Sequence, residues 1–228
     1  MSFEALGDHL AIALPGGTAL FTTRRGGVSE GPFASLNLGL WTDDDADRVR
    51  ENRTRVELLT GGRLAPARQV HGTDVVEADP RAVAEADGQV TAEHGVAAMA
   101  LTADCLPIAL VAPEGVAMLH AGWRGLANGV IANGADALRK LGAGRIAAAI
   151  GPGAGPCCYE VGDEVRAAFG TSGRTVDLKA IARDRLEQAG VAVVHDCGLC
   201  TMHDPERFFS HRRDRGVTGR QAGVAWRS

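Results

Sequence analysis

Short apolar runs bounded by turn residues predict most of the strands of this chain. Ala11–Thr23 is predicted to form one or two strands, interrupted at Pro15-Gly16-Gly17, because proline and glycine break a regular pattern. A polar stretch over residues 22–29 is predicted to be a loop. Buried strands are predicted where an apolar run of about four to eight residues lies between turn residues. These runs are Gly95–Thr102, Pro107–Val111, Val116–His120, Arg145–Ile150, Val191–Val194 and Gly223–Trp226.

Helical periodicity, together with residues typical of helix ends, predicts four helices. Acidic residues at 43–45 offer an N-cap for a helix over Ala46–Thr60, and Gly61 can end it. The inner face of this helix is marked by Val49, Val56 and Leu59. The clearest helix is Arg124–Leu141, which Gly142 follows. Two further helices are predicted, over Glu160–Phe169 and Asp177–Ala189.

Predicted helices and strands alternate along the chain, and no Ser- or Pro-rich linker divides it. The sequence contains no internal repeat and no low-complexity segment. A length of 228 residues is long for one domain but lies within the range of α/β domains. The pattern therefore predicts one α/β domain over residues 1–228.

Composition narrows the class of protein. Apolar residues make up 45% and aromatic residues 4%, so the core is predicted to consist mainly of Ala, Val, Leu and Ile. The net charge of −4 gives no basic excess of the kind that nucleic-acid binding requires. No apolar run approaches the roughly 20 residues of a membrane span. We therefore expect neither a nucleic-acid partner nor a membrane partner.

The compartment is indicated by the N-terminal residues and the cysteines. Residues 1–11 contain Glu4 and Asp8 but lack the basic start of a signal peptide. Five cysteines, an odd number in a chain of this size, argue against a disulfide framework. Both observations predict a cytoplasmic protein.

Three segments place reactive side chains beside predicted strand ends. His71 lies in Gln69-Val-His-Gly-Thr-Asp74, Cys105 lies in the turn between two strands, and His120 ends a strand just before a helix. Side chains at such positions can converge on one edge of a sheet. Two imidazoles and one thiolate suit zinc, and three protein ligands leave a fourth position open, as in catalytic zinc sites.

Two other interpretations remain open when only residue types are considered. The spacing matches no short metal motif, and the ordinary structural role of buried or surface histidines and of a small buried cysteine is the more frequent one. Alternatively, Cys105 is a nucleophile and His120 its base. In that dyad, the imidazole would be oriented by Asp104 or Asp74.

Arginines and the remaining cysteines give weaker signals. Arg24, Arg25 and Arg124 flank glycines, and Arg124 begins a predicted helix, where free N–H groups and the helix dipole favour phosphate. For each arginine taken singly, a surface ion pair is an equally good interpretation. Cys197-Gly-Leu-Cys200 is a lone C-x-x-C pair and is interpreted as structural thiols. The adjacent Cys157 and Cys158 are assigned no role.

Motifs in the same order along nearly the whole chain resemble those of one family. The matching segments are Phe21–Ser29, Ser35–Gly39, Gln69–Gly72, Ala86–Gly88, Leu101–Pro107, His120–Gly125, Ile150–Pro152, Cys158–Val161, Phe208–Arg213 and Thr218–Gly223. The chain thus resembles the YfiH-like family, also called the laccase-domain, polyphenol oxidase or peptidoglycan editing factor family.

This resemblance implies a fold, a metal and an activity. The implied fold is a compact layered α/β sandwich with central β-sheets and outer helices, similar to that of cytotoxic necrotizing factor. The resemblance implies that His71, Cys105 and His120 hold one zinc ion and act in catalysis. It also implies phosphorolysis of adenosine, inosine, guanosine and methylthioadenosine, and deamination of adenosine. The residues expected to bind substrate or phosphate are Arg24, Asn37 and Arg124.

Alternatives to this activity come from the family's other names. Copper is the less favoured metal, because multicopper oxidases use paired His-x-His motifs and this chain has 7 His and no such pair. The editing-factor name implies a cysteine-type amidase that acts on peptidoglycan precursors through Cys105 and His120. A zinc-stabilised binding module is disfavoured, since structural zinc usually has four protein ligands.

Overall fold

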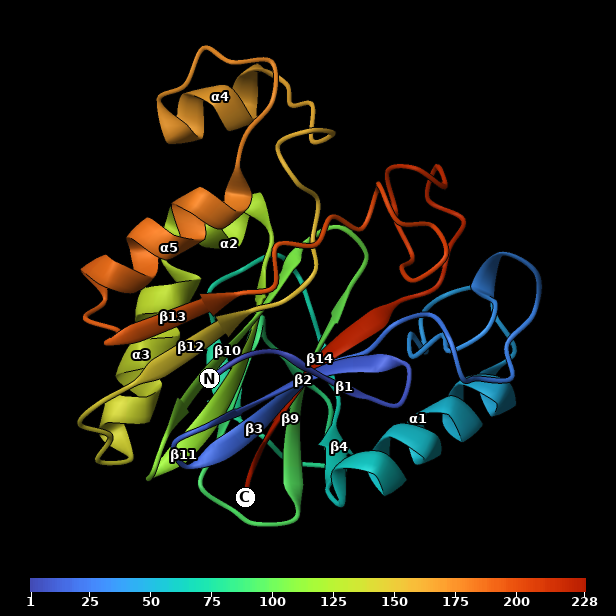
Figure 1. The fold of residues 1–228 in the computed structure, drawn as a ribbon, viewed down its shortest axis with the longest axis horizontal. Helices are drawn as coiled ribbons and strands as arrows, with labels where there is room; N and C mark the ends of the chain where they lie inside the picture. Colours follow the sequence, from blue (N-terminus) through green and yellow to red (C-terminus); the bar gives the residue numbers. More distant parts are fainter.

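Two six-stranded sheets lie face to face at the centre of the computed structural model, which describes residues 1–228 (Figure 1). The first sheet has the order β1-β2-β3-β14-β9-β4, and only the β4–β9 pair is parallel. Its strands are β1 (Glu4–Leu6), β2 (His9–Leu14), β3 (Gly17–Phe21), β14 (Gln221–Arg227), β9 (Val96–Thr102) and β4 (Arg63–Ala65).

The second sheet has the order β13-β12-β10-β11-β8-β6. Its middle is the antiparallel hairpin of β10 and β11, while β12–β13 and β6–β8 are parallel pairs. Its strands are β13 (Val193–Asp196), β12 (Ala147–Ile150), β10 (Leu106–Ala112), β11 (Gly115–Ala121), β8 (Gly88–Thr91) and β6 (Val75–Glu77). A separate parallel pair is formed by β5 (Ala67–Arg68) and β7 (Ala84–Glu85).

The helix predicted over Ala46–Thr60 is confirmed with the same bounds as α1. The Asp45 carboxylate accepts hydrogen bonds from two backbone N–H groups of the first turn, and Gly61 ends the helix in the left-handed conformation. The predicted inner face is wrong at one position. Leu59 is 37% exposed, because the buried face is completed by Asn52 and Thr60 instead.

The single helix predicted over Arg124–Leu141 is wrong, because two helices occupy this stretch. They are α2 (Trp123–Asn128) and α3 (Val130–Lys140), separated by Gly129, whose φ of 102° is incompatible with a continuous helix. The other helices are α4 (Asp163–Phe169), α5 (Leu178–Gln188) and a short 3-10 turn η1 (Gly31–Phe33). None of these helices is both long and apolar enough to cross a membrane.

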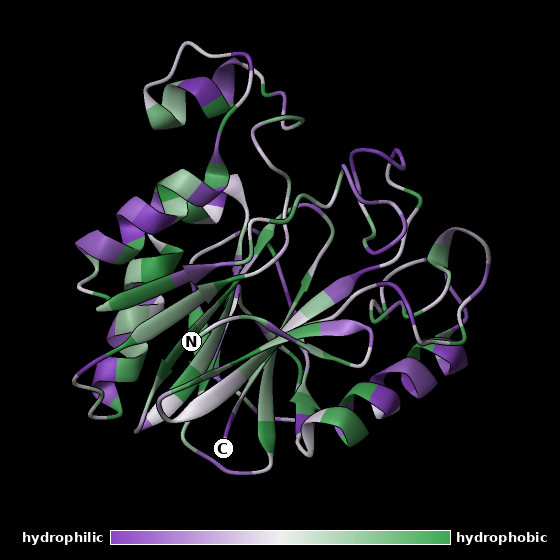
Figure 2. Ribbon diagram, viewed as in Figure 1, coloured by the Kyte–Doolittle hydropathy of each residue, from purple (hydrophilic) through white to green (hydrophobic).

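Helices cover the two outer faces of the sheet pair, which gives four layers (Figure 1). α1 packs over the first sheet, against buried residues such as Leu64 and Met99. α2, α3 and α5 pack over the second sheet, against Leu110 and Leu119. Between the sheets lie mostly small side chains, alanines above all, and apolar residues concentrate in the strands (Figure 2). The predicted α/β class and layered arrangement are confirmed.

Several strand predictions are correct in type but shifted in position. The stretch Ala11–Thr23 forms two strands, β2 and β3, separated at Pro15-Gly16 as predicted. The strand predicted from Arg145 starts at Ala147, and the one predicted over Val191–Val194 lies two residues later as β13. The last predicted strand, β14, lies in the middle of the first sheet. The short strands β1 and β4 to β8 have no clear apolar pattern and were not predicted.

Candidate metal centre and cavity

Cys105 and His120 are brought together by the β10–β11 hairpin. Cys105 ends the short crossing, residues 103–105, that carries the chain from β9 in the first sheet to β10 in the second. His120 lies on β11, where it pairs with Pro107. Because Pro107 is only two positions from Cys105, the two side chains reach the same end of the hairpin.

His71 completes the cluster from a separate loop that follows β5. Its backbone has a φ of 60°, and its Nε2 lies 3.9 Å from the Sγ of Cys105. The rings of His71 and His120 meet edge to face, with centroids 4.9 Å apart. One nitrogen of each histidine and the Cys105 sulfur all lie within 4.8 Å of one another, so the three predicted ligands can reach a common ion.

Gly122 allows this close approach. A Cβ at this position would lie 3.0 Å from Cδ2 of His71 and 3.1 Å from Sγ of Cys105. Contacts this short would push one of the two side chains away from the cluster. The absence of a side chain at Gly122 is therefore part of how the fold forms the cluster.

Asp87 orients both histidines, and sequence reasoning assigned it no role. Its Oδ1 lies 2.7 Å from Nδ1 of His120, and both groups are buried. The same carboxylate accepts backbone N–H groups of His71 and its neighbours Val70 and Gly72 at 2.7–3.1 Å. Since Nδ1 of His120 is engaged by Asp87, Nε2 is the nitrogen left for a metal. The only sequence signal was the motif Ala86-Asp-Gly88.

The charges of Cys105 and His120 stabilise each other. Burial raises the pKa of the Cys105 thiol, but the charge and hydrogen bond of His120, followed by those of His71, outweigh it and lower the pKa to about 6. Burial lowers the pKa of His120, but the Cys105 thiolate and Asp87 outweigh it and raise the pKa to about 9. The site therefore favours a thiolate, which is the form of cysteine that binds metals.

The two carboxylates predicted to orient the imidazole do not contact His120. Asp104 accepts hydrogen bonds from the Thr201 hydroxyl at 2.7 Å and from the Arg212 backbone N–H at 2.8 Å. The side chain of Asp74 makes no hydrogen bond, and its backbone carbonyl accepts N–H groups of Asp87 and Gly88. The predictions for Asp74 and Asp104 are therefore wrong, and Asp87 holds this position.

A cavity of about 480 Å³ opens above the cluster, a size typical of small-molecule sites. His71, Cys105 and His120 are all part of its lining. The walls carry three aromatic side chains and four arginines: Trp41, Trp123, Tyr159, Arg68, Arg124, Arg212 and Arg220. Flat rings suit a planar base and guanidinium groups suit an anion, so the cavity offers partners for both kinds of group.

Of the arginines predicted to bind phosphate, only Arg124 reaches this cavity. It is the second residue of α2, stacks on Trp123 with 4.3 Å between guanidinium carbon and ring centroid, and donates to Glu164. Its side chain is half-exposed. Arg212, which lies over Tyr159 and donates to the Glu160 carbonyl, lines the same cavity and was not predicted.

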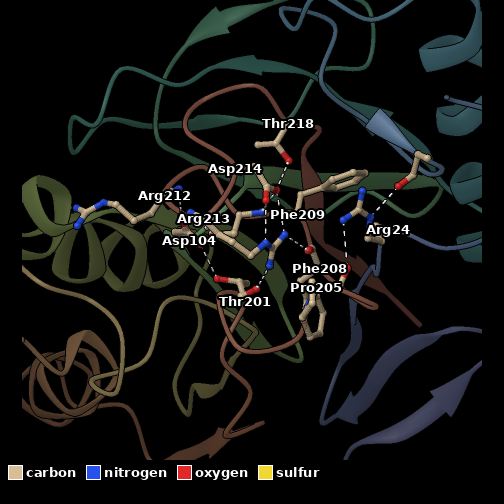
Figure 3. A network of polar contacts seen from close by, with 12 residues as sticks. Arg24, Asp104, Thr201, Pro205, Phe208, Phe209, Arg212, Arg213, Asp214 and Thr218 are labelled. Atoms are coloured by element: carbon tan, nitrogen blue, oxygen red, sulfur yellow. Dashed lines mark hydrogen bonds and ion pairs between the residues drawn. The ribbon is translucent and has the colours of Figure 1, made fainter. Parts of the chain in front are cut away.

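Arg24 and Asn37 do not line the cavity. Arg24 donates to the carbonyls of Ala34 and Pro205 and packs on Phe209 (Figure 3). Asn37 is fully buried, and its side-chain oxygen accepts the backbone N–H groups of Gly39 and Arg220. Because Gly39 and Arg220 line the cavity, Asn37 supports the wall from behind.

The donor set fits zinc better than electron-transfer copper. Two imidazoles and one thiolate with an open side suit a catalytic zinc ion, whereas an electron-transfer copper site typically adds a weak axial methionine. No methionine lines the cavity. The chain forms only two clusters of potential ligands, this one and a second at Cys157, Cys158, Cys200 and His203.

Comparison with known proteins identifies the family of the chain. Residues 18–228 match the family model described as multi-copper polyphenol oxidoreductase laccase. A protein of Pseudomonas aeruginosa named purine nucleoside phosphorylase is 44% identical over 91% of this chain and 92% of its own length. The purine nucleoside phosphorylase YfiH of Escherichia coli is 39% identical, over 92% of this chain and 94% of its own length.

Solved structures give the same assignment. The crystal structure of YlmD from Geobacillus stearothermophilus superposes with a TM-score of 0.90 and 35% identity, covering 98% of this chain and 97% of that one. A Neisseria meningitidis protein of the DUF152 family superposes with a TM-score of 0.89 and 35% identity, covering 97% and 100%. The chain therefore belongs to the YfiH-like, laccase-domain family.

Proposed function

We propose that the protein is a purine nucleoside phosphorylase that holds zinc at His71, Cys105 and His120. Its proposed substrates are adenosine, inosine, guanosine and methylthioadenosine, and it also deaminates adenosine. One observation carries this proposal: the three potential ligands lie at a cavity whose walls combine aromatic rings with arginines. The names of the relatives as purine nucleoside phosphorylases support it.

The chain's own residues position the metal and the substrates. His71, Cys105 and His120 would hold the zinc ion, which would supply Lewis-acid chemistry when bound. Asp87 fixes the ring of His120 and the backbone of His71, so the ligands are oriented before the ion binds. The rings of Trp123 and Tyr159 offer faces for stacking a purine.

Phosphorolysis requires an anion site next to the nucleoside. In this reaction a phosphate oxygen forms a bond to the ribose C1′ while the bond from C1′ to the purine nitrogen breaks. Arg124 and Arg212 are the proposed phosphate ligands, because their guanidinium groups lie at the cavity and can each donate two hydrogen bonds. The purine leaves with the electron pair of the broken bond and is then protonated.

The test is an assay of inosine with and without phosphate. Hypoxanthine and ribose 1-phosphate are expected only when phosphate is present, whereas adenosine deamination is expected to be independent of phosphate. Equal release of free ribose in the absence of phosphate would instead identify a hydrolase. Metal analysis of protein purified without chelator, before the assay, links each activity to its zinc content.

A cysteine-type amidase acting on peptidoglycan precursors is the second candidate, and one observation favours it. Cys105, His120 and Asp87 also have the order of a nucleophile, a base and a residue that orients the base. His71 separates the two proposals. With zinc as cofactor, His71→Ala, Cys105→Ala and His120→Ala each lose the metal and both nucleoside activities. With a cysteine dyad, His71→Ala keeps most of the activity while the other two variants lose it.

A further inference from the structure

A second group of potential ligands lies outside the cavity, on two segments that are distant in the sequence. The thiols of Cys157, Cys158 and Cys200 and the imidazole of His203 have ligand atoms within 4.8 Å of one another. None of these residues lines the cavity described above. We propose that these four side chains bind a second zinc ion, which fastens two irregular segments that form a wall of the cavity.

The distances within the group match a tetrahedral zinc site. With zinc–sulfur bonds of about 2.3 Å and zinc–nitrogen bonds of about 2.0–2.1 Å, sulfur atoms lie ~3.8 Å apart and a sulfur and a nitrogen lie ~3.5 Å apart. Sγ of Cys157 lies 3.7 Å from Sγ of Cys200 and 3.5 Å from Nδ1 of His203. The Cys157–Cys158 separation of 3.1 Å is too short for this geometry and has to widen, and the remaining ligand atoms lie within 4.8 Å of one another. Neither side chain is deeply buried, so both can rotate.

The donor set belongs to a structural site. Three thiolates and one imidazole occupy all four positions of tetrahedral zinc, which leaves none open for substrate. The backbone N–H of Gly155 donates to the Cys200 sulfur at 3.2 Å, a contact that holds this sulfur in place and suits a thiolate. The candidate catalytic cluster differs in two ways, because it has only three ligands and they face a cavity.

The two cysteines of the C-x-x-C pair lie in different environments, so Cys197 serves as a control for Cys200. Cys200 joins the cluster, whereas the Cys197 sulfur lies 3.8 Å from the ammonium group of Lys179 on α5. All five cysteines are free thiols in the structure, and the sulfur separations in the cluster are far from the roughly 2.05 Å of a disulfide. The cluster therefore consists of thiols that are not joined by a disulfide bond.

The two segments that the ion would join are irregular and already contact each other. The first, residues 151–162, follows β12, and the second, residues 197–220, follows β13 (Figure 1). Next to the cluster, Thr201 donates its backbone N–H to the Gly153 carbonyl at 3.1 Å. The Asp104 carboxylate also holds the second segment, because it accepts hydrogen bonds from the Thr201 hydroxyl and the Arg212 backbone N–H (Figure 3). Within this segment, the Arg213 guanidinium donates to the Thr201 carbonyl.

Both segments contribute to the cavity. Tyr159 comes from the first segment and Arg212 from the second, and the Arg212 guanidinium donates to the Glu160 carbonyl at 2.7 Å. Neither segment contains a helix or strand, so turns and single hydrogen bonds hold them in place of a regular ladder. A four-ligand ion joining residue 157 to residues 200 and 203 would fix the wall that carries these two side chains.

The test counts zinc in the full chain purified without oxygen and without chelator. Wild-type protein is expected to contain about two zinc ions per chain, one for each site. Cys157→Ser and Cys200→Ser are each expected to lose one ion, and Cys197→Ser is expected to retain both. Cys105→Ser removes the catalytic ligand set alone and is expected to retain the ion bound by Cys200. This variant separates a failure of the second site from a failure of the proposed function.

A measurement on wild-type protein does not depend on whether a variant folds. The thiols of residues 157, 158 and 200 are expected to resist alkylation until a chelator removes the zinc, as mapped by peptide mass. The proposal is overturned if these thiols react fully before chelation. It is equally overturned if Cys200→Ser retains the wild-type zinc content, or if mapping finds a disulfide between Cys157 and Cys200 in the protein purified without oxygen.

Discussion

The carboxylate of Asp87 and the imidazole of His120 form a buried pair, with Oδ1 2.7 Å from Nδ1. The other contacts of this carboxylate are to the backbone that carries His71. One acidic side chain therefore sets the positions of two proposed ligands that lie 49 positions apart in the sequence, since Asp87 accepts from residue 71 and from residue 120.

Replacing Asp87 with Asn is expected to weaken metal binding by about 10–100-fold, the usual cost of losing a residue that orients a ligand. Chelator competition measures this loss directly. Asp74→Asn is the matched control, because the Asp74 carboxylate is nearby but makes no hydrogen bond. Equal metal affinity in Asp87→Asn and Asp74→Asn would show that Asp87 does not orient the ligands.

Arg124→Ala is expected to raise the KM for phosphate by about tenfold to a hundredfold, in line with the loss of charged hydrogen bonds. Deamination of adenosine should change much less, and Arg124→Lys should recover only part of the effect, because lysine lacks the bidentate geometry. Steady-state kinetics with varied phosphate provides the measurement. If both reactions suffer equally, Arg124 positions the nucleoside instead.

Arg24→Ala is expected to have the opposite profile. Arg24 lies outside the cavity and donates to the carbonyls of Ala34 and Pro205 (Figure 3). We therefore expect a lower melting temperature and an unchanged KM for phosphate. A selective rise in that KM would restore Arg24 as a phosphate ligand.

Gly122→Ala tests the close packing around the ligand cluster. The added methyl group would lie about 3.0 Å from His71 and 3.1 Å from Cys105. A misfit of this kind costs about 1–3 kcal/mol, and here it falls on the ligands, so zinc affinity and activity should both decrease. Gly144→Ala is the control, because its Cβ would meet no atom within 4 Å. Full zinc occupancy and activity in Gly122→Ala would contradict this account.

Asp214 is expected to give the fold a pH-dependent contribution. Burial raises the pKa of its carboxyl group, but the Arg213 guanidinium and the Thr218 hydroxyl outweigh burial and lower the pKa below its usual value. A carboxylate whose pKa is lowered on folding stabilises the protein above its unfolded pKa of about 4. That stabilisation is lost as the pH falls through the lower, folded pKa.

Asp214→Asn should therefore unfold at a lower urea concentration than wild type at pH 7, and the difference should shrink as the pH falls below about 4. Asp184→Asn, at an exposed carboxylate of α5 without a hydrogen bond, is the control and should match wild type throughout. A difference that is constant with pH would mean that Asp214 acts through packing and not through its charge.

Local signals in the sequence predicted local structure well. Asp45 and Gly61 mark the two ends of α1, and the bounds predicted from them are confirmed. At Gly129 the same kind of reasoning failed, because glycine inside an apolar periodic pattern is compatible with both a continuous and a broken helix. The break at Gly129 leaves α2 in contact with α4, while α3 contacts β8 and β6.

The candidate site was only partly predictable, for a different reason. His71, Cys105 and His120 are chemically reactive residue types within distinctive motifs, so they attract attention in the sequence. Asp87 does not, because its importance comes from contacts with residues 16 and 33 positions away. The same limit applies to Cys157 and His203, which are separated by 46 positions and meet only in the folded chain.

The central position of β14 has a consequence for the order of folding. Thr22 follows its strand partner β3, and the Thr22 hydroxyl accepts a hydrogen bond from the backbone N–H of residue 222, 200 positions later. During synthesis, the first sheet therefore remains split, with β3 and β9 exposing unpaired edges, until β14 has emerged from the ribosome. Such long-range pairing predicts slow folding.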